Sequence, residues 1–463
     1  MTGFLIRNLR NGLLIEWALA SLITVSALYS LWHLWYYSYL PQPFFYEPSD
    51  LFADWFNTSY WARDEGSYDV WATLYPPLSF VFLDIFGIDA CYPRVRAYDP
   101  SAGLAARGCD WLGTVTLFGS FFLSGYVAWR IIRKLNTNIY RAIPRTICVA
   151  IGWPMLDALE RGNLMLVAFV CFALAFGPIL KSARLRWLFA GLAVNFKVYL
   201  IASIMPLLFK RKWLWVEGAL IATILVYLVS FAILGRGTPI EIVTNLTSWS
   251  QLGTASPLDM WFSTTYKAFL ALLDGEVFPA TLILGSQTVD RLQWILPTLL
   301  YSVQATILIA FAFAWYRPEV ISHYRLVNLG TMLALITSEA GGYTPAFFTL
   351  LIMLEKWKGF GRIYCIVMCY LLAVSFDIPI DQAQPVVRDT AIRNSTVIVT
   401  FYVTIGPFIR PALILSIPFA LALTTIRAVW LDIRQQGWSE RWRFRNDAAL
   451  LPWIRRPEPP KSA

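Results

Sequence analysis

The sequence contains little charge and almost no histidine. Only 14% of its 463 residues are charged, whereas a soluble domain of this size carries about 25%, so the composition excludes a soluble protein. The histidines are His33 and His323, and the chain has no Cys-x-x-Cys pair, which argues against a structural zinc site. We expect no required cofactor, although the acidic first loop could hold a divalent cation weakly.

Nucleotide-binding and hydrolase motifs are also missing. There is no Walker sequence, no Gly-x-Gly-x-x-Gly and no Gly-x-Ser-x-Gly, which argues against nucleotide-driven transport and against serine hydrolysis. The net charge of +9 does not indicate a nucleic acid partner, because Lys and Arg occur in short clusters between apolar segments. Such clusters are typical of the cytoplasmic loops of membrane proteins.

Long apolar runs make up most of the chain, of which 57% is hydrophobic. Runs near the length of about 20 residues that crosses a hydrocarbon core recur along it. The clearest are Leu13–Leu40, Trp111–Ile132, Val216–Leu234, Leu292–Tyr316 and Leu413–Leu431. The first run is too long for a signal-peptide core and lacks a cleavage pattern, so we expect a retained helix. The sequence predicts an all-α polytopic membrane protein.

The charge pattern orients this protein, because basic clusters mark the cytoplasmic side. The clusters are Arg130/Arg133/Lys134/Arg141/Arg145, Lys181/Arg184/Arg186, Lys210/Arg211/Lys212, Arg317/Arg325, Lys356/Lys358/Arg362 and the tail from Arg434 to Lys461. The acidic stretches then face outside; they are Glu47–Asp110, Asp157–Glu160, Arg236–Asp290, Glu339–Pro345 and Asp377–Asp389. This map predicts roughly 11–13 crossings and cytoplasmic termini. It predicts one transmembrane domain over residues 1–433, with outer loops at 41–110 and 235–291, and a basic tail at 434–463.

Two segments do not fit ordinary spans. Tyr75–Ile88 is about 14 residues long, too short to span comfortably, so we expect an interfacial helix that begins at Pro76-Pro77. Leu188–Phe209 has basic residues at both flanks. It is either two short helices that meet near Asn195-Phe196-Lys197 at membrane depth, or one ordinary helix with a basic flank outside. A broken helix is tolerated there only beside a protein-enclosed or wet cavity.

The cysteines test this map. Cys91 and Cys109 bracket a polar stretch that the map places outside, in an oxidising compartment, so we expect a disulfide. Two unpaired thiols are expected instead if this loop is cytoplasmic. The other four cysteines lie in apolar segments and are interpreted as packing residues.

Four segments with polar residues are candidates for chemistry. Asp50 and Asp54 would share one face of a helix, where a like-charged neighbour and a partly dry site would raise one pKa and suit a general base. The alternative is a solvated acidic loop. The segment Asp157-Ala-Leu-Glu160-Arg161-Gly-Asn163 interrupts two apolar helices; Arg161 could bind phosphate through two hydrogen bonds. The alternative is a turn closed by a Glu160–Arg161 pair.

Lys197 is a lone ammonium among apolar residues and needs an anionic partner. A lipid phosphate would serve, and snorkelling of the side chain to the interface is the alternative. In Glu339-Ala-Gly-Gly-Tyr343, the two glycines break a helix and would leave room for a sugar or a lipid.

Together these features resemble the GT-C superfamily of integral-membrane glycosyltransferases, in particular the polyprenyl-phosphate-mannose-dependent mannosyltransferases and related bacterial cell-envelope enzymes. Four local patterns carry the resemblance, over about the first two-thirds of the chain. They are Asp50 and Asp54 in the first outer loop, Tyr75-Pro-Pro-Leu78, Arg161-Gly-Asn163, and Gly191 followed by Lys197-Val-Tyr199-Leu.

The resemblance implies a GT-C-like bundle in a bacterial inner membrane and a polyprenyl-phosphate sugar donor. It also implies transfer to a lipid or glycan acceptor on the extracytoplasmic side, with inversion. The first-loop aspartate would be the general base, carried onto Asp50 first and Asp54 second, because the chain lacks a strict Asp-x-Asp and has the Cys91–Cys109 insertion. Arg161 and Lys197 would meet the donor phosphate. The remaining expected substrate contacts are Tyr75, Glu160, Asn163, Glu339 and Tyr343.

Two other functions were weighed. A lipid-linked oligosaccharide polymerase or ligase would place its large loop and paired arginines late in the chain, whereas the acidic loop is early here. A secondary transporter or flippase would show inverted repeats and charges at mid-membrane. The sequence shows no internal repeat, and its intramembrane charges are few.

Overall fold

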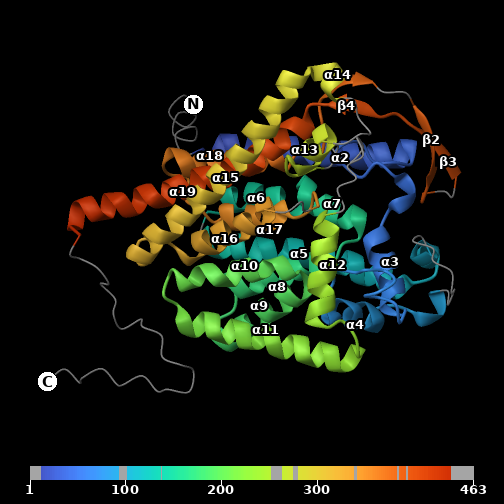
Figure 1. The fold of residues 1–463 in the computed structure, drawn as a ribbon, viewed down its shortest axis with the longest axis horizontal. Coiled ribbons are helices and arrows are strands. Elements are labelled where there is room, and N and C mark those ends of the chain that lie inside the picture. The colour runs from blue at the N-terminus through green and yellow to red at the C-terminus, as the bar shows by residue number, and fades with distance from the viewer. Residues whose placement is uncertain are drawn as a thin grey trace.

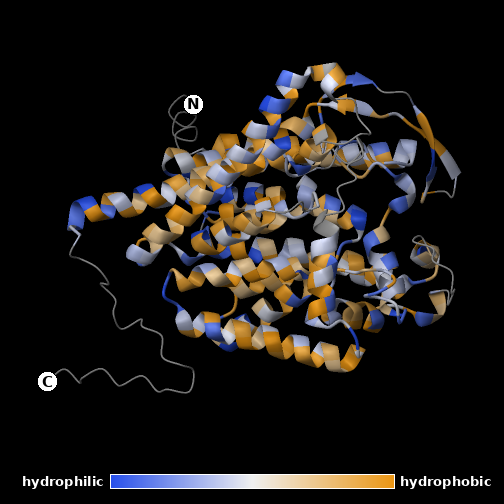
Figure 2. Ribbon diagram, in the orientation of Figure 1, coloured by the Kyte–Doolittle hydropathy of each residue, from blue (hydrophilic) through white to orange (hydrophobic). Residues whose placement is uncertain are grey.

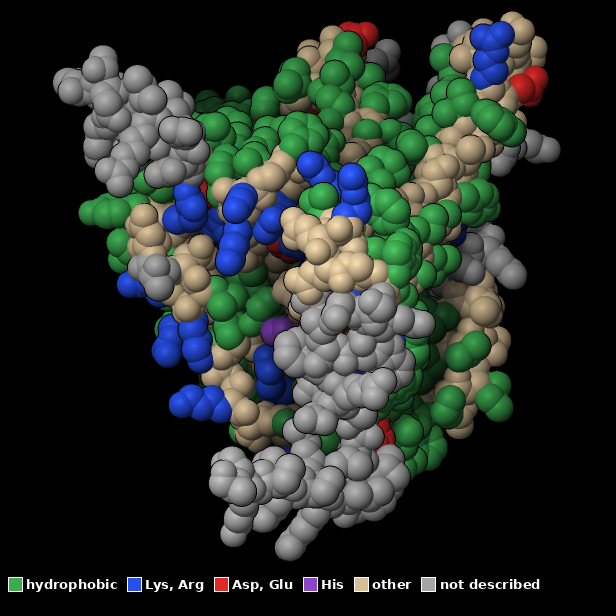
Figure 3. Space-filling view, turned by 90° about the vertical axis from the view of Figure 1, so that its left-hand side faces the viewer, with side chains coloured by type: hydrophobic (Ala, Val, Ile, Leu, Met, Phe, Trp, Pro, Cys, Tyr) green, Lys and Arg blue, Asp and Glu red, His purple; other side chains and the backbone are tan. Residues whose placement is uncertain are grey.

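The computed structural model describes residues 12–92, 102–136, 138–251, 263–274, 280–337, 341–382, 385–392 and 395–438. Long helices run across the view in Figure 1, and shorter helices and strands gather at the right-hand end. We call this the loop end; it comprises residues 41–92, 102–110 and 377–405. Figure 3 looks at the opposite end and shows many Lys and Arg side chains there, which we call the basic end.

Six helices among the described residues are long and apolar enough to cross a membrane. They are α2 (Leu13–Tyr37), α5 (Trp111–Leu135), the pair α6 and α7 (Ile139–Ala150 and Trp153–Arg161), α11 (Trp213–Leu234), α15 (Ser286–Tyr316) and α19 (Gly406–Gln436). Each apolar run identified in the sequence lies in one of them, except that the first run extends three residues past the end of α2. Hydrophobic residues dominate much of these helices (Figure 2), and many of their large apolar side chains are exposed. The protein is an all-α polytopic membrane protein, as predicted. The count of roughly 11–13 crossings stays a prediction.

Short apolar helices fill the centre of the bundle. Every residue of α17 (Pro345–Ile352) is buried, as are nearly all of α8 (Met165–Phe176). They pack with α16 (His323–Thr337), α9 (Ala183–Phe196) and α18 (Phe360–Leu372) in one continuous core. Helices that are apolar all round belong inside a bundle, so these segments support the long helices around them.

The segment with two basic flanks is broken, and the alternative of one ordinary helix is wrong. α9 ends at Phe196, and Lys197 is extended with φ −142° and ψ 101°. The chain then continues through η4 (Val198–Leu200), α10 (Ile201–Ile204) and η5 (Met205–Leu208). The Asn195 side chain donates to the carbonyls of Gly191 and Thr223, at 2.8 and 3.0 Å, and so links the end of α9 to α11.

The first predicted outer loop consists of short helices. They are η1 (Pro48–Asp50), α3 (Ala53–Ala62), α4 (Pro77–Ile85), η2 (Asp89–Cys91) and η3 (Ala102–Gly108). α4 begins after Pro76, as expected from the two prolines. Cys91 and Cys109 form the predicted disulfide, while the other four cysteines are free and buried.

Parts of the other predicted loops have regular structure that the sequence analysis did not identify. Residues 235–291 contain α12 (Pro239–Gln251), α13 (Lys267–Asp274) and α14 (Ala280–Leu284). After α18, strands β1 (Pro379–Gln382) and β4 (Tyr402–Thr404) pair antiparallel, as do β2 (Val386–Thr390) and β3 (Ser395–Val399). α19 continues to Gln436, past the expected start of the tail at residue 434, and the boundary between domain and tail stays a prediction. The tail from residue 439 lies outside the described residues.

A buried ion pair holds the bundle together near the start of α2. Glu16 and Arg145 are 0% and 1% exposed, and their closest N–O distance is 2.8 Å. Arg145 Nη1 also donates to the carbonyls of Met353 and Glu355, at 2.6 and 2.8 Å. One guanidinium therefore joins α2, α6 and the segment after α17.

Replacing the Glu16 carboxylate should destabilise the whole bundle. In Glu16→Gln the buried Arg145 guanidinium loses its counter-charge, and breaking such a pair costs about 3–5 kcal/mol. Thermal unfolding of the purified protein in detergent measures the loss. Asp381→Asn, on an exposed position of β1, is the matched control and should unfold like wild type; equal unfolding of both variants would contradict the role of the pair.

Candidate functional site

Asp50 and Asp54 meet Arg161 at the loop end. Asp54 Oδ1 accepts from Arg161 Nη2 at 2.9 Å, and its Oδ2 accepts from Asn163 Nδ2 at 2.6 Å. Asp50 Oδ2 lies 3.7 Å from Arg161 Nη1. The three charged side chains are 32%, 24% and 16% exposed for Asp50, Asp54 and Arg161. The first loop and the junction after α7, separate in the sequence, form one half-buried charged cluster.

The prediction that Asp50 and Asp54 share one face of a helix is wrong. They do not share one continuous helix, because Asp50 ends η1, Asp54 lies in the first turn of α3, and Phe52 between them has φ +64°. The expected alternative of a Glu160–Arg161 pair is also wrong, since Arg161 pairs with the two aspartates. The aspartates converge because both approach the same guanidinium.

Gly162 allows this approach. It ends α7 with φ +65°, and the Asn163 amide donates to the Ala158 carbonyl at 2.8 Å, a bond typical of a left-handed helix C-cap. A Cβ at Gly162 would lie 2.9 Å from Trp55 Cβ and 3.0 Å from Phe52 Cα. The Phe52 amide also donates to the Glu160 carbonyl at 2.7 Å, so the first loop rests directly on the end of α7.

Burial raises the pKa of Asp50 above its usual value, Arg161 opposes this, and the charge of Asp54 adds to the rise. Arg107 holds the backbone on either side of Asp50 by donating to the Ser49 and Leu51 carbonyls, at 2.7 and 2.8 Å. Asp50 therefore has a fixed backbone and a carboxylate whose pKa is raised although the charges of Arg161 and Arg107 act against the rise. These properties suit a proton acceptor.

Lys197 lies beside two tyrosines and has no carboxylate partner. Its Nζ is 3.5 Å from the Tyr75 hydroxyl, 4.6 Å from the Tyr75 ring centre and 5.5 Å from that of Tyr343. Across the described parts of the chain, no Asp or Glu oxygen is within 4.0 Å of this ammonium. Tyr75 also interacts with Asn163, which connects Lys197 to the Asp54–Arg161 pair.

Two buried acids lie behind this cluster, on α7. Asp157 and Glu160 are 3% and 6% exposed, and Glu160 Oε2 has no hydrogen-bond partner among the described residues. A Cβ at Gly342 would lie 2.7 Å from Asp157 Oδ2 and 2.6 Å from the Trp153 ring. Gly342 was expected to leave room for a sugar or a lipid, but the side chains of Asp157 and Trp153 fill the space beside it. Glu339, a further expected substrate contact, lies outside the described residues.

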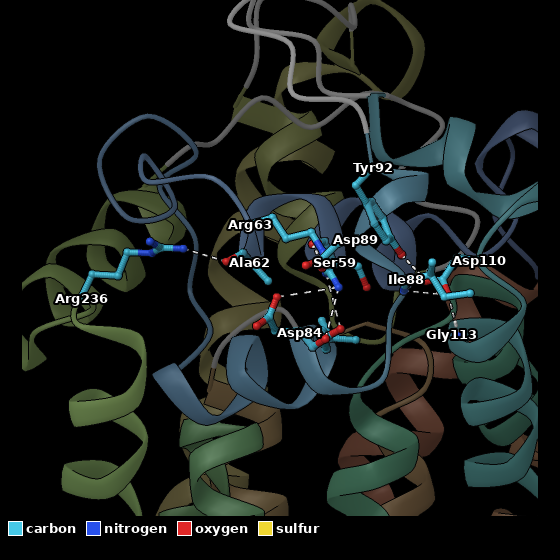
Figure 4. A network of polar contacts seen from close by, with 11 residues as sticks. Ser59, Ala62, Arg63, Asp84, Ile88, Asp89, Tyr92, Asp110, Gly113 and Arg236 are labelled. Atoms are coloured by element: carbon cyan, nitrogen blue, oxygen red, sulfur yellow. Dashed lines mark hydrogen bonds and ion pairs between the residues drawn. The ribbon is translucent and has the colours of Figure 1, made fainter.

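The sequence analysis missed the network that holds the first loop together (Figure 4). Arg63 binds Asp89 at 2.7 Å and the Ser59 carbonyl at 2.9 Å, and it lies 4.5 Å from the Tyr92 ring centre. Asp110 caps α5 by accepting from the Gly113 amide at 2.9 Å, and it accepts from the Tyr92 hydroxyl at 2.6 Å. The position of Asp110 directly before an apolar run is a helix-start signal that could have been read from the sequence. No local sequence pattern indicates the contacts of Arg63.

Gly162→Ala should detach the first loop from α7. The added Cβ destabilises the folded state in two ways: the left-handed backbone conformation costs about 1–2 kcal/mol, and overpacking against Trp55 costs about 1–3 kcal/mol. Gly235→Ala is the control, because Gly235 has φ +74° with nothing within 4 Å of an added Cβ and should lose the strain part alone. Hydrogen exchange of residues 50–62 should accelerate only in Gly162→Ala, and equal exchange in both variants would contradict this docking.

The cluster thus combines three groups near the loop end. They are the Asp50 carboxylate with its raised pKa, the Asp54 carboxylate bound by Arg161 and Asn163, and the Lys197 ammonium. Among the described residues, no three potential His, Cys, Asp or Glu ligands gather to hold a metal ion. Comparisons with protein-family models, with curated proteins and with solved structures find no match for this chain.

Proposed function

We propose that the protein is an integral-membrane glycosyltransferase that uses a polyprenyl-phosphate monosaccharide. It transfers the sugar to a lipid or glycan acceptor on the extracytoplasmic side of a bacterial inner membrane. The observation that carries this proposal is Lys197, an ammonium among tyrosines with no carboxylate within 4.0 Å in the described structure, on which the charge of Asp54 acts from further away.

The donor phosphate fits best at Lys197. A cation away from water needs an anion, and the charge of Arg161 is already balanced by Asp54 and Asp50. The hydroxyl of Tyr343 could add a further donor near the same place. Arg161 Nη1 has no hydrogen-bond partner among the described residues and is left to donate to a phosphate oxygen, as the second phosphate contact.

An apolar groove beside these residues suits the polyprenyl tail. It has a volume of 350 Å³ and is lined by Leu78 of α4, Leu192 of α9 and Leu225 of α11, among others. Leu78 follows Tyr75 closely in the chain, and Leu192 lies on the helix that ends before Lys197. Leu225 and Val229 of this groove are 56% and 61% exposed, so the groove opens toward lipid.

The proposed reaction is a single displacement. The acceptor oxygen forms a bond to the anomeric carbon while the bond from that carbon to the phosphate oxygen breaks, which inverts the configuration. The electron pair leaves with the polyprenyl phosphate, whose charge is stabilised by Lys197 in a preorganised site. The acceptor proton moves to Asp50, and Asp54 keeps Arg161 in position.

Two observations support the extracytoplasmic side for this chemistry. The Cys91–Cys109 disulfide lies in the first loop, and disulfides persist in oxidising compartments. Basic side chains gather at the opposite end of the bundle (Figure 3), as on the cytoplasmic side of membrane proteins.

Activity should fall as the pH drops through the raised pKa of Asp50, because only the ionised carboxylate accepts the proton. Asp54→Asn removes the neighbouring charge that raises this pKa, so the acid limb of kcat/KM should move to lower pH. Rates are measured on protein in nanodiscs with a polyprenyl-phosphate sugar. Asp69→Asn, an exposed first-loop residue, should leave the limb unchanged; an unmoved limb in Asp54→Asn would argue against Asp50 as the base. Normal turnover by the Asp50→Asn, Asp54→Asn double variant would refute the mechanism.

Lys197→Met should lower kcat/KM for the lipid-phosphate donor about 10²–10³-fold, the usual loss for a removed transition-state donor. It should also raise the unfolding temperature, since an unpaired charge away from water is costly. Lys181→Met, at an exposed position, should change neither value. Unchanged donor kinetics in Lys197→Met would contradict the phosphate site.

The transporter alternative is tested with wild-type protein in proteoliposomes. Solute flux without product formation would favour a transporter.

A further inference from the structure

A second cavity lies at the loop end, outside the charged cluster. Its volume is 210 Å³, smaller than the roughly 300–1,000 Å³ of sites for drug-sized ligands. It is enclosed by the end of α2, the segment 39–46, and residues 376–379 and 399–404 around β1 and β4. Seven Tyr and Phe side chains line it, together with His33: Tyr29, Tyr39, Phe44, Tyr46, Phe376, Phe401 and Tyr402. The cavity is therefore small and mainly aromatic.

One polar side chain in this cavity has an unused donor. Gln42 Oε1 accepts from the Tyr402 amide at 3.3 Å, which fixes the orientation of the side-chain amide. Its Nε2 is buried and has no hydrogen-bond partner in the described structure. Buried donors are nearly always paired, so this amide points to a ligand hydroxyl as the missing acceptor.

The cavity offers no free charge. Among the described residues that line it, Asp377 is the only Asp, Glu, Lys or Arg, and the ring of His33 is held by a 2.8 Å hydrogen bond between its Nδ1 and the Tyr39 carbonyl. Both oxygens of Asp377 accept from Arg410 Nη1 at 2.7 Å, and Thr404 donates to one of them at 3.1 Å. A neutral ligand therefore fits better than an anion or a cation.

Aromatic contacts connect this cavity to the charged cluster. Tyr46 lines the cavity and lies 4.5 Å, centre to centre, from the Phe45 ring, over which the Arg161 guanidinium lies at 4.1 Å. Arg410 lies 5.0 Å from the Trp153 ring centre on α7. The ring of Phe45 thus lies between Tyr46, which lines the cavity, and the guanidinium of Arg161.

We propose that this cavity binds one neutral sugar ring of the acceptor. Aromatic faces pack against the C–H face of a sugar, while Gln42, Thr400 and Asp377 supply hydrogen-bonding groups for its hydroxyls. Only the assignment of this sugar to the acceptor rests on the proposed function. If the assignment holds, the acceptor is a glycan and not a simple lipid.

Saturation-transfer NMR on the full chain in nanodiscs tests the cavity without any donor. The probes are methyl glycosides of glucose, mannose, galactose and arabinose, with methyl glucuronoside as the charged comparison. At least one neutral glycoside should bind, and the charged one should bind more weakly. Gln42→Glu keeps the acceptor for Tyr402 but replaces the free donor, and it should weaken binding at least 10-fold. Tyr402→Ala should do the same, while Tyr301→Ala, on an outward-facing position of α15, should bind like wild type.

Transfer assays separate this inference from the proposed function. Gln42→Glu and Tyr402→Ala should raise the KM for a glycan acceptor and leave the donor KM unchanged, with unfolding temperatures measured to confirm folding. Asp50→Asn, which removes the proposed base, should lose transfer and keep glycoside binding. Absence of neutral glycoside binding, or binding unaffected in both cavity variants, would overturn the inference. Glycoside binding that depends on Gln42, combined with no transfer by wild type, would overturn the proposed reaction and uphold the cavity as a sugar site.

Discussion

A guanidinium held between two carboxylates determines where the first loop meets the helical bundle. Arg161 sits at the end of α7 and binds Asp54 directly and Asp50 at a longer distance. The contact is possible because Gly162 leaves room for Trp55 and Phe52. The same guanidinium lies over Phe45, so the chain before and after η1 converges on one side chain. Tyr75, Asp50 and the aromatic cavity owe their relative positions to this contact.

The two cations of the site have different surroundings, and this difference indicates different roles. Arg161 is compensated within the protein, which suits a group that fixes geometry. Lys197 has only tyrosine contacts among the described residues, which leaves its charge for a ligand. Natural proteins accept unfavourable local features of this kind mainly where function requires them. Gln42, with its unpaired amide donor, is a milder example in the neighbouring cavity. Together they describe one anionic and one neutral binding position near Arg161.

Sequence reasoning recovered the features that depend on local pattern. The apolar runs, the proline start of α4 and the Cys91–Cys109 bond were readable, because length, turn chemistry and redox environment determine them. The break at Lys197 was one of two alternatives that the basic flanks left open. Contacts between distant segments were not readable. Glu16 and Arg145 are 129 residues apart, and no local signal pairs them. Asp54 and Arg161 were identified separately, but their contact depends on how α3 docks. The strand Ser395-Thr-Val-Ile-Val399 carried a β-branched signal that could have been used.

The backbone at Lys197 has a practical consequence. Its extended conformation is one that most residue types adopt, so the position accepts substitution without strain. The four free cysteines are buried, which leaves a thiol introduced by Lys197→Cys as the reactive one. A thiocyanate attached there would carry a nitrile whose infrared frequency reports the local electric field. A nitrile at the break in this helix would thus report, through its infrared frequency, the electric field that an incoming phosphate would experience.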